Sequence, residues 1–289
     1  MRSEKVPVLS FVFNPLIILI DMSTRKHLFL LFSLICLFLT TTAQKSNEQF
    51  FAFKEDWSPA NSIDRATYFM YKLKENDTTY SCRFYHKNGP MIRCETYRDN
   101  EMQIPHGRFA WYNKNGHIDS TGLVRFGKKD GYWEYKRPDG TTVSVVHFNI
   151  GKRILTRNYD TRTVYYTDGR PDEPMDALFF MKNNFTNDNK PPEFKGGVRG
   201  WVNYLEKNLE TPGRFRQIFG PGTKGTVVVS FKVDTTGAVS ELNIDKSVEW
   251  SVDMETLRVF KRSPQWEPAV QNGKLVNYYH RQSITHVVN

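Results

Sequence analysis

Two cysteines and two histidines are the side chains whose types and spacing could support chemistry in this chain. Cys82 and Cys94 flank Lys87-Asn88-Gly89-Pro90, which is a turn signal between two strand-like runs. Cysteines on facing strands can form a disulfide in an oxidising compartment, so we expect a bridge between them, with two buried free thiols as the alternative. His280 and His286 could titrate near neutral pH. No other ligand types cluster near them, so we expect no metal site.

The sequence does not indicate catalysis. It contains no Ser/His/Asp or Cys/His order with a supporting motif, and no carboxylate pair in a recognisable setting. Gly196-Gly197 could suggest a phosphate-cradling loop, but no strand–loop–helix pattern of the P-loop type and no downstream Lys–Thr pair accompany it. We therefore predict that the protein is not an enzyme and needs no cofactor.

Bulk composition indicates a folded, basic protein. The 289 residues are 39% hydrophobic and 14% aromatic, which suits one large or two small globular domains and argues against disorder. The net charge of +9 favours contact with an anionic surface such as acidic lipids, lipopolysaccharide or wall polymers. The alternative is a solvated basic protein that binds no polyanion. We expect no nucleic-acid partner.

The first 43 residues predict export. Arg25-Lys26 precede an apolar core, Leu28 to Leu39, and small residues follow with a cleavage point after position 43. Met22 is the natural start of such a signal, which makes residues 1–21 the product of an upstream start at Met1. The core is shorter than the roughly 20 residues of a spanning helix, which favours cleavage over anchoring. The expected location is the periplasm, either secreted or anchored in the inner membrane.

The region 80–170 repeats itself, following a lead segment, 44–79, to which we assign no role. Gly107-Arg-Phe-Ala-Trp111 with Asn115-Gly116 recurs 24 residues later as Gly131-Tyr-Trp-Glu-Tyr135 with Asp139-Gly140. A fixed period indicates a repeat array whose units bury their apolar faces against their neighbours. Alternating aromatics and Asn-Gly or Asp-Gly turns predict antiparallel β-hairpins in a single-layered sheet.

These units resemble MORN-type repeats in the variant form of bacterial envelope proteins. The resemblance implies protein contacts or acidic phospholipids as partners. We expect the aromatic ladder of Phe109, Trp111, Trp133 and Tyr135 to form a core, with a ligand platform as the alternative. Two equivalent basic pairs could make a stripe along one face or be solvated turn charges: Lys128-Lys129 and Lys152-Arg153.

A linker, residues 171–190, precedes a second domain, 191–289, for which the pattern predicts a small α+β fold. Helical spacing covers 200–209, a glycine-rich loop covers 213–224, and an alternating strand covers 225–234 with a return strand over 239–244. Asp253 is the expected N-cap of a second short helix, and 275–288 is the expected last strand. This last strand should lie at the edge of the sheet, where unpaired backbone groups can accept an incoming peptide.

The order and spacing of the Pro- and Gly-containing motifs in this domain resemble those of the C-terminal domain of the TonB family. The matching motifs are Pro191-Pro-Glu-Phe-Lys-Gly-Gly197 and Ser263-Pro-Gln-Trp-Glu-Pro-Ala269. The resemblance implies that a short peptide of an outer-membrane transporter adds beside the last strand, in support of energised transport. It also implies a scaffold role for the motif residues Pro192, Glu193, Phe194, Gly196, Gly197, Trp266, Pro268 and Ala269. The implied binding edge is Asn277, Tyr278, Tyr279, His280, Arg281, Gln282, Ser283, Ile284, Thr285 and His286.

Two departures from the family pattern limit what the resemblance implies. The last strand closes with Ser283-Ile-Thr-His286 where the family has proline, isoleucine, threonine and phenylalanine, and its inner face contains three polar members. Those side chains must either meet polar partners or pack less tightly. The chain also lacks a Pro-rich spacer. If residues 28–39 remain as an anchor, motor proteins of the inner membrane are further partners. The alternative is a periplasmic adaptor without energy transduction, and the edge also allows a homodimer.

Overall fold

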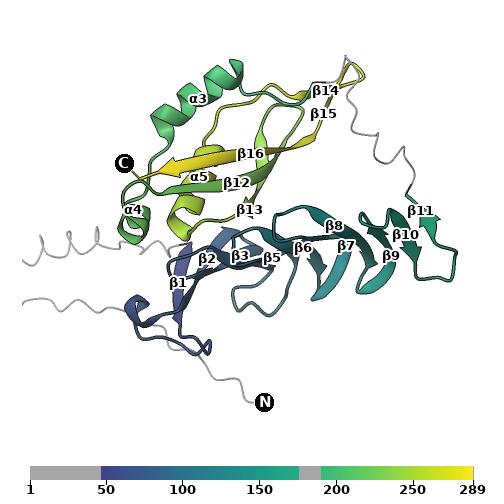
Figure 1. The fold of residues 1–289 in the computed structure, drawn as a ribbon, viewed down its shortest axis with the longest axis horizontal. Coiled ribbons are helices and arrows are strands. Elements are labelled where there is room, and N and C mark those ends of the chain that lie inside the picture. Colours follow the sequence, from purple (N-terminus) through teal and green to yellow (C-terminus); the bar gives the residue numbers. More distant parts are fainter. Residues whose placement is uncertain (1–46, 176–189, 289) are drawn as a thin grey trace, which may run out of the picture. The chain divides into compact units, whose positions relative to one another are not determined.

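The structure is a computed structural model that describes residues 47–175 and 190–288. The predicted signal or anchor and most of the predicted linker lie outside these residues. The described chain forms a large antiparallel sheet of eleven strands, followed by a small α+β region (Figure 1). The predicted two-part architecture is confirmed at this level. Among the described residues, no helix has both the length and the apolar character needed to span a membrane.

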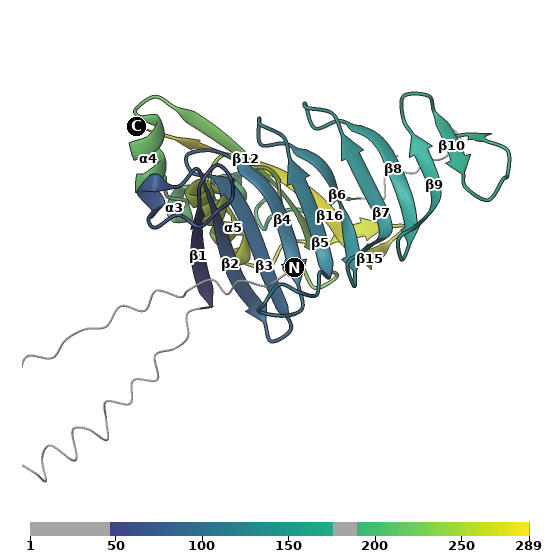
Figure 2. The same ribbon diagram turned by 90° about the horizontal axis from the view of Figure 1, so that it is seen from below.

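The strands of the large sheet follow one another in chain order, each paired antiparallel with the preceding one (Figure 2). Their bounds are β1 Glu48–Phe53, β2 Tyr68–Asn76, β3 Thr79–His86, β4 Met91–Tyr97, β5 Gly107–Tyr112, β6 Ile118–Arg125, β7 Lys128–Lys136, β8 Thr142–Asn149, β9 Lys152–Asn158, β10 Thr163–Tyr166 and β11 Glu173–Pro174, with a 3-10 turn, η1, at Ile63–Arg65. β1 and β2 extend the sheet into the lead segment, where the sequence pattern suggested no role.

The tight turns between strands reproduce the period seen in the sequence. Phe126 and Gly127 have φ of 48° and 76°, and their counterparts one repeat later, Ile150 and Gly151, have φ of 42° and 85°. Two consecutive positive φ angles match the hairpin turns whose twist suits antiparallel strands. Self-similarity in the sequence therefore corresponds to self-similarity of the backbone.

The aromatic ladder forms a small core on one face of the sheet. Phe109 and Trp133 are buried, and the Trp111 ring lies 5.8 Å from that of Trp133. Trp133 fits because it lies over Gly122, where a Cβ would come within 2.5 Å of the indole. Lys129 Nζ lies 4.2 Å from the centre of the Trp133 ring, so this lysine covers the ladder and is not a solvated turn charge.

The C-terminal region contains a three-stranded sheet of order β13-β12-β16 with helices on one face. Its elements are α3 Gly197–Asn208, α4 Gly213–Phe219, β12 Lys224–Val233, β13 Val239–Lys246, α5 Trp250–Lys261, β14 Ala269–Gln271, β15 Lys274–Val276 and β16 Tyr278–Val287. The predicted loop at 213–224 contains α4. The predicted long last strand breaks at Asn277, because β15 pairs with β14 in a separate hairpin.

The predicted N-cap of α5 is wrong. Glu249 takes this position, and its side chain accepts a hydrogen bond from the backbone N–H of Val252. Asp253 lies within the first turn of the helix and is fully buried. Its carboxylate accepts hydrogen bonds from Tyr85 of the large sheet and from Ser247 and Val248, which precede the helix.

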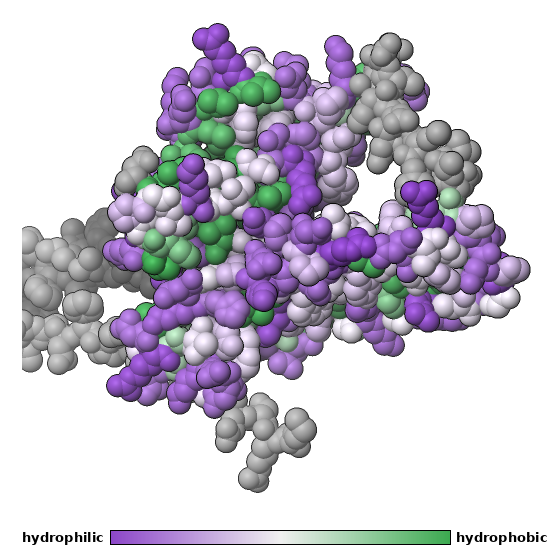
Figure 3. Space-filling model, in the orientation of Figure 1, coloured by the Kyte–Doolittle hydropathy of each residue, from purple (hydrophilic) through white to green (hydrophobic). Residues whose placement is uncertain are grey.

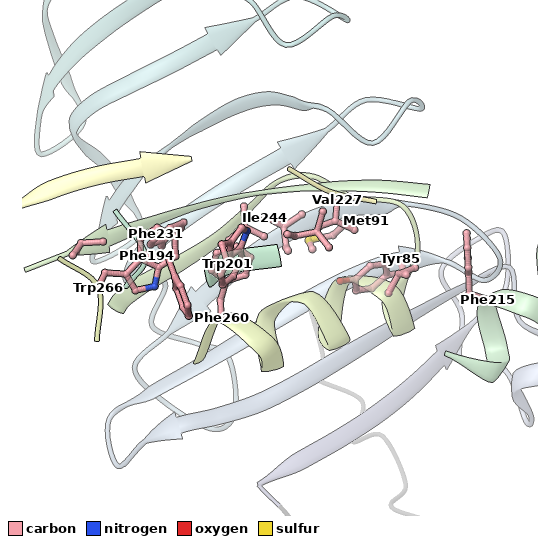
Figure 4. Close-up of a cluster of buried hydrophobic side chains, with 14 of the residues drawn as sticks. Tyr85, Met91, Phe194, Trp201, Phe215, Val227, Phe231, Ile244, Phe260 and Trp266 are labelled. Carbon is pink, nitrogen blue, oxygen red and sulfur yellow. The ribbon is translucent and has the colours of Figure 1, made fainter. Parts of the chain in front are cut away.

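One hydrophobic cluster joins the two parts of the described chain (Figure 4). Phe231 of β12 packs against Phe260 of α5 and against Trp266, with ring centres about 5 Å apart. Tyr85 and Met91 of the large sheet belong to the same cluster and are almost fully buried. The C-terminal region therefore shares its core with the first strands of the sheet.

The bridge predicted between Cys82 and Cys94 is contradicted, because both thiols are free. The register pairs Cys82 with Glu95 and Cys94 with Arg83, so the cysteines occupy adjacent positions along the ladder. Successive side chains of a strand point to opposite faces. Accordingly, Cys82 packs with Met70 and Phe84 in one cluster, whereas Cys94 packs against the shared core on the other face. Burial raises the pKa of the Cys82 thiol to about 12.

Candidate functional site

β16 is bound to the sheet along one side only. It pairs with β12 over its whole length, from Tyr278 opposite Val233 to Val287 opposite Lys224. β12 is the only strand that pairs with it in the described part of the chain. The predicted edge therefore coincides with β16 except at Asn277, which precedes the strand.

The backbone pattern shows which groups of β16 face outward. Val288 donates its N–H to Thr223 O on the β12 side. Because the hydrogen-bonding direction alternates along an antiparallel strand, every second residue before Val288 also faces β12. The N–H and C=O groups of the residues between them point away from the sheet, and these residues are Tyr279, Arg281, Ser283, Thr285 and Val287. Thr211 Oγ1 donates to the Val287 carbonyl over 3.1 Å, at the very end of this edge.

The polar side chains on the inner face of β16 meet polar partners, which was one of the two outcomes expected from the sequence. His286 is buried, and its Nε2 lies 2.9 Å from Thr256 Oγ1 of α5. The side chain of Gln282 lies 2.9 Å from His280 Nε2, and the His280 ring packs edge-on against Phe231. Burial lowers the pKa of both histidines, which favours their neutral forms.

Side chains on the outer face of β16 are tied across the sheet. The Tyr279 hydroxyl donates to Glu241 over 2.6 Å, and Arg281 forms an ion pair with Asp245 at 3.2 Å. The hydrogen bond from Tyr279 lowers the pKa of Glu241. Both cross-links run to residues of β13, away from the open side of β16.

The opposite edge of the same sheet, β13, is covered at its C-terminal end by the large sheet. The Tyr112 hydroxyl donates to Ile244 O over 2.7 Å, and Ser247 N donates to Gly116 O over 2.8 Å. His117 forms an isolated antiparallel bridge with Lys246. The hairpin between β5 and β6 therefore lies against the C-terminal end of β13 and occupies the backbone groups there.

A buried polar network links α5 to the large sheet. Ser247 Oγ donates to Asp253 over 2.5 Å and accepts a hydrogen bond from Met91 N over 2.8 Å. The Tyr85 hydroxyl lies 3.2 Å from the same carboxylate. Burial raises the pKa of Asp253 to about 7, against the opposing effect of these hydrogen bonds. Nothing in the sequence indicated this network, because its members come from distant segments.

A second link adds a charge pair beside the first. Arg214 of α4 lies 3.2 Å from the buried carboxylate of Glu249 and also donates to the carbonyl of Lys87. The turn between β3 and β4 is thus bound to α4. The same arginine pairs with the negative charge of Glu249, the N-cap of α5.

The predicted scaffold motifs come together near the start of α3 and the end of α5. Phe194 packs edge-on against Trp266, with ring centres 5.5 Å apart, and Glu193 forms an isolated bridge with Glu267. Gly196 and Gly197 have positive φ where α3 begins. Of the remaining motif residues, Pro192 and Ala269 are buried and Pro268 is half-buried. None of these residues reaches the outer backbone of β16.

The arrangement of strands and helices in this region agrees with a family comparison. Residues 221–287 match the model of the Gram-negative bacterial TonB protein C-terminal family. The match spans β12, β13, α5 and β14 to β16, and leaves α3 and the large sheet outside. No curated protein and no solved structure matches the chain.

The match supports a TonB C-terminal domain at the end of this chain and, at the level of the family, a role in energised transport in the Gram-negative envelope. The family match suggests outer-membrane transporters as partners at the same coarse level. Within residues 47–175 and 190–288, no group of three His, Cys, Asp or Glu side chains could hold a metal ion.

Proposed function

We propose that this protein binds a short extended segment of an outer-membrane transporter by adding it as a further strand beside β16. The observation that carries the proposal is the difference between the two edges of the TonB C-terminal domain. Tyr112 and Gly116 bond Ile244 and Ser247 at the C-terminal end of β13, whereas the outward groups from Tyr279 to Thr285 meet no strand within the described residues. An unpaired edge supplies main-chain hydrogen bonds to an incoming peptide.

The large sheet has a supporting role in this proposal. We interpret residues 80–170 as MORN-like repeats that hold the domain with its β16 edge outward. The protein would act in the periplasm, coupled to the motor proteins of the inner membrane only if residues 28–39 remain in the membrane. We expect no catalytic activity from either part.

A periplasmic adaptor without energy transduction is the second candidate. The shared core and the Asp253 network favour it, because they fix the domain to the sheet as a scaffold would. N-terminal sequencing of the mature protein separates the two functions. A mature chain that starts at Gln44 has no anchor and cannot transmit force from the inner membrane, whereas a retained segment permits coupling.

Strand addition can be tested with one pair of variants. Ser283 lies in the middle of the open edge, and its N–H faces outward. Ser283→Pro removes that donor, while Ser283→Ala retains it and changes only the exposed hydroxyl. The probes are overlapping ten-residue peptides from the periplasm-facing segments of outer-membrane transporters encoded by the same genome.

We expect wild type and Ser283→Ala to bind the same peptide, and Ser283→Pro to bind it at least about tenfold more weakly, because a peptide carbonyl loses its donor. Amide chemical shifts should locate the peptide at β16. Equal binding by both variants would place the binding edge elsewhere. Self-association that the proline variant abolishes would identify a second copy as the occupant of the edge.

A further inference from the structure

We infer that the segment added beside β16 has apolar side chains at alternate positions and that the exposed flank of α3 selects them. This inference rests on the proposed strand addition and specifies its partner. The flank consists of Val198 and Val202, which are 78% and 44% exposed although both are apolar. Figure 3 shows apolar surface over α3.

The contacts of α3 place it on the β16 side of the domain. α5 packs over β12 and β13. α3 lies beside α5 on the same face, since Tyr204 donates its hydroxyl to Val259 O over 3.0 Å and Arg258 donates to Asn208 O over 2.6 Å. α5 also reaches the end of β16, where Thr256 contacts His286. Nearer the start of β16, the Trp201 ring of α3 packs against Trp266, which in turn packs against His280. α3 is therefore linked to this part of β16 through Trp266.

The flank formed by Val198 and Val202 points away from α5. At about 100° per residue, Val202 lies roughly 160° around the helix from Tyr204, which contacts α5. Val198 lies one turn earlier on the same side. Between these two directions, Trp201 points into the core and packs against Trp266. The exposed valines therefore border the region that a strand added to β16 would enter.

Strand geometry then determines which side chains of the partner meet this flank. A strand added to β16 lies about 4.8 Å beyond it, and successive side chains point to opposite faces. Every second side chain of the partner must face the helix layer, where it covers Val198 and Val202. The side chains between them face solvent, beside Tyr279 and Arg281.

The chemistry of the flank favours valine, isoleucine or leucine at the inward positions. Apolar contact there removes water from both surfaces. A charged side chain at the same position would lose water without gaining a partner. Because α3 lies outside the residues that match the family, this selectivity belongs to the part of the chain that the family match does not describe.

Two synthetic nine-residue peptides of identical composition test the inference on the full-length chain. One alternates four valines with serine and lysine, and the other places the valines consecutively. Val202→Asp introduces a charge on the flank, and Asn203→Asp introduces the same charge one residue later, on the solvent side of the helix. Transporter-derived peptides and the Ser283→Pro variant complete the set, with affinity measured by fluorescence anisotropy.

We expect the alternating peptide to bind at least about tenfold more tightly than its isomer, and Val202→Asp to remove that preference while Asn203→Asp retains it. Both peptides should lose affinity in Ser283→Pro. Equal binding of the two isomers, unchanged by Val202→Asp, overturns the selectivity and leaves strand addition intact. Failure of both isomers also overturns it, and failure of the transporter peptides as well overturns strand addition.

Discussion

The two edges of the three-stranded sheet have the same kind of backbone and opposite surroundings. The C-terminal end of β13 lies against a hairpin of the large sheet, where Tyr112 bonds Ile244 and Gly116 bonds Ser247, the residue after the strand. β16 is paired only with β12 among the described residues. An exposed strand edge promotes non-specific pairing, and proteins usually cover or interrupt such edges. Covering the end of one edge and leaving the other open along its length favours strand addition beside β16.

The contact at Gly116 should be the most sensitive part of the covered edge. A Cβ at this position would come 2.1 Å from Ser247 O, and φ is +80°. Gly127 is a matched control, because its φ of +76° is similar and a Cβ there would meet nothing within 4 Å. We expect Gly127→Ala to lower the free energy of unfolding by about 1–2 kcal/mol and Gly116→Ala by about 3–5 kcal/mol.

Guanidinium denaturation measures this difference, and hydrogen exchange shows where it acts. Amides of β13 should exchange faster in Gly116→Ala than in Gly127→Ala. Equal losses of stability in both variants would mean that backbone strain alone accounts for the effect. In that case the hairpin would contribute nothing to covering β13.

The buried carboxyl of Asp253 should make the covered edge depend on pH. Its pKa is raised to about 7, so folding favours the protonated form. Its contribution to stability is complete below the ordinary aspartate pKa near 4 and is lost as the pH rises through about 7. We expect the stability of wild type relative to Asp253→Asn to fall by on the order of 3 kcal/mol between pH 4 and pH 8.

His280 and His286 act in the opposite direction, because burial lowers their pKa and their neutral forms become more favourable as the pH rises. The histidines are present in both proteins. Subtracting the free energy of unfolding of Asp253→Asn from that of wild type at each pH therefore removes their effect. A difference between the two proteins that stays constant from pH 4 to pH 8 would show that Asp253 is ionised throughout.

The sequence predicted elements and missed contacts between them. Alternation in the 225–234 run located β12 within one residue of its bounds, since each side chain reports locally on which face is buried. Asp253 was assigned to a helix end because aspartate commonly occupies that position. Its use instead depends on Tyr85 and Met91, which only the folded chain brings near.

The two edges also differed in how far they could be predicted. β16 was predicted as the open edge from strand order and family resemblance. The cover on β13 left no signal, because Asn115-Gly116 reads as a hairpin turn whether or not anything packs against it. The disulfide failed for a related reason. Spacing around a turn does not determine register, and a shift of one residue places two cysteines on opposite faces.

The hydrogen bond from Tyr112 isolates one polar contact of the covered edge. Tyr112→Phe removes the hydroxyl that donates to Ile244 O and leaves this carbonyl without that donor. We expect a loss of about 1–2 kcal/mol in the free energy of unfolding, measured by urea denaturation. If Tyr112→Phe were as stable as wild type, water would be replacing the hydroxyl at Ile244 O. This part of β13 would then be accessible to solvent.

The same substitution on the open edge should have the smallest effect. The Tyr279 hydroxyl donates to Glu241, but its side chain is 65% exposed, so water can replace the bond in Tyr279→Phe. We expect a loss below about 0.5 kcal/mol. Peptide affinity should also be retained, because strand addition uses the backbone of Tyr279 and not its ring oxygen. A loss as large as that of Tyr112→Phe would show that side-chain hydrogen bonds stabilise both edges equally. The contrast between the edges would then no longer explain where a partner binds.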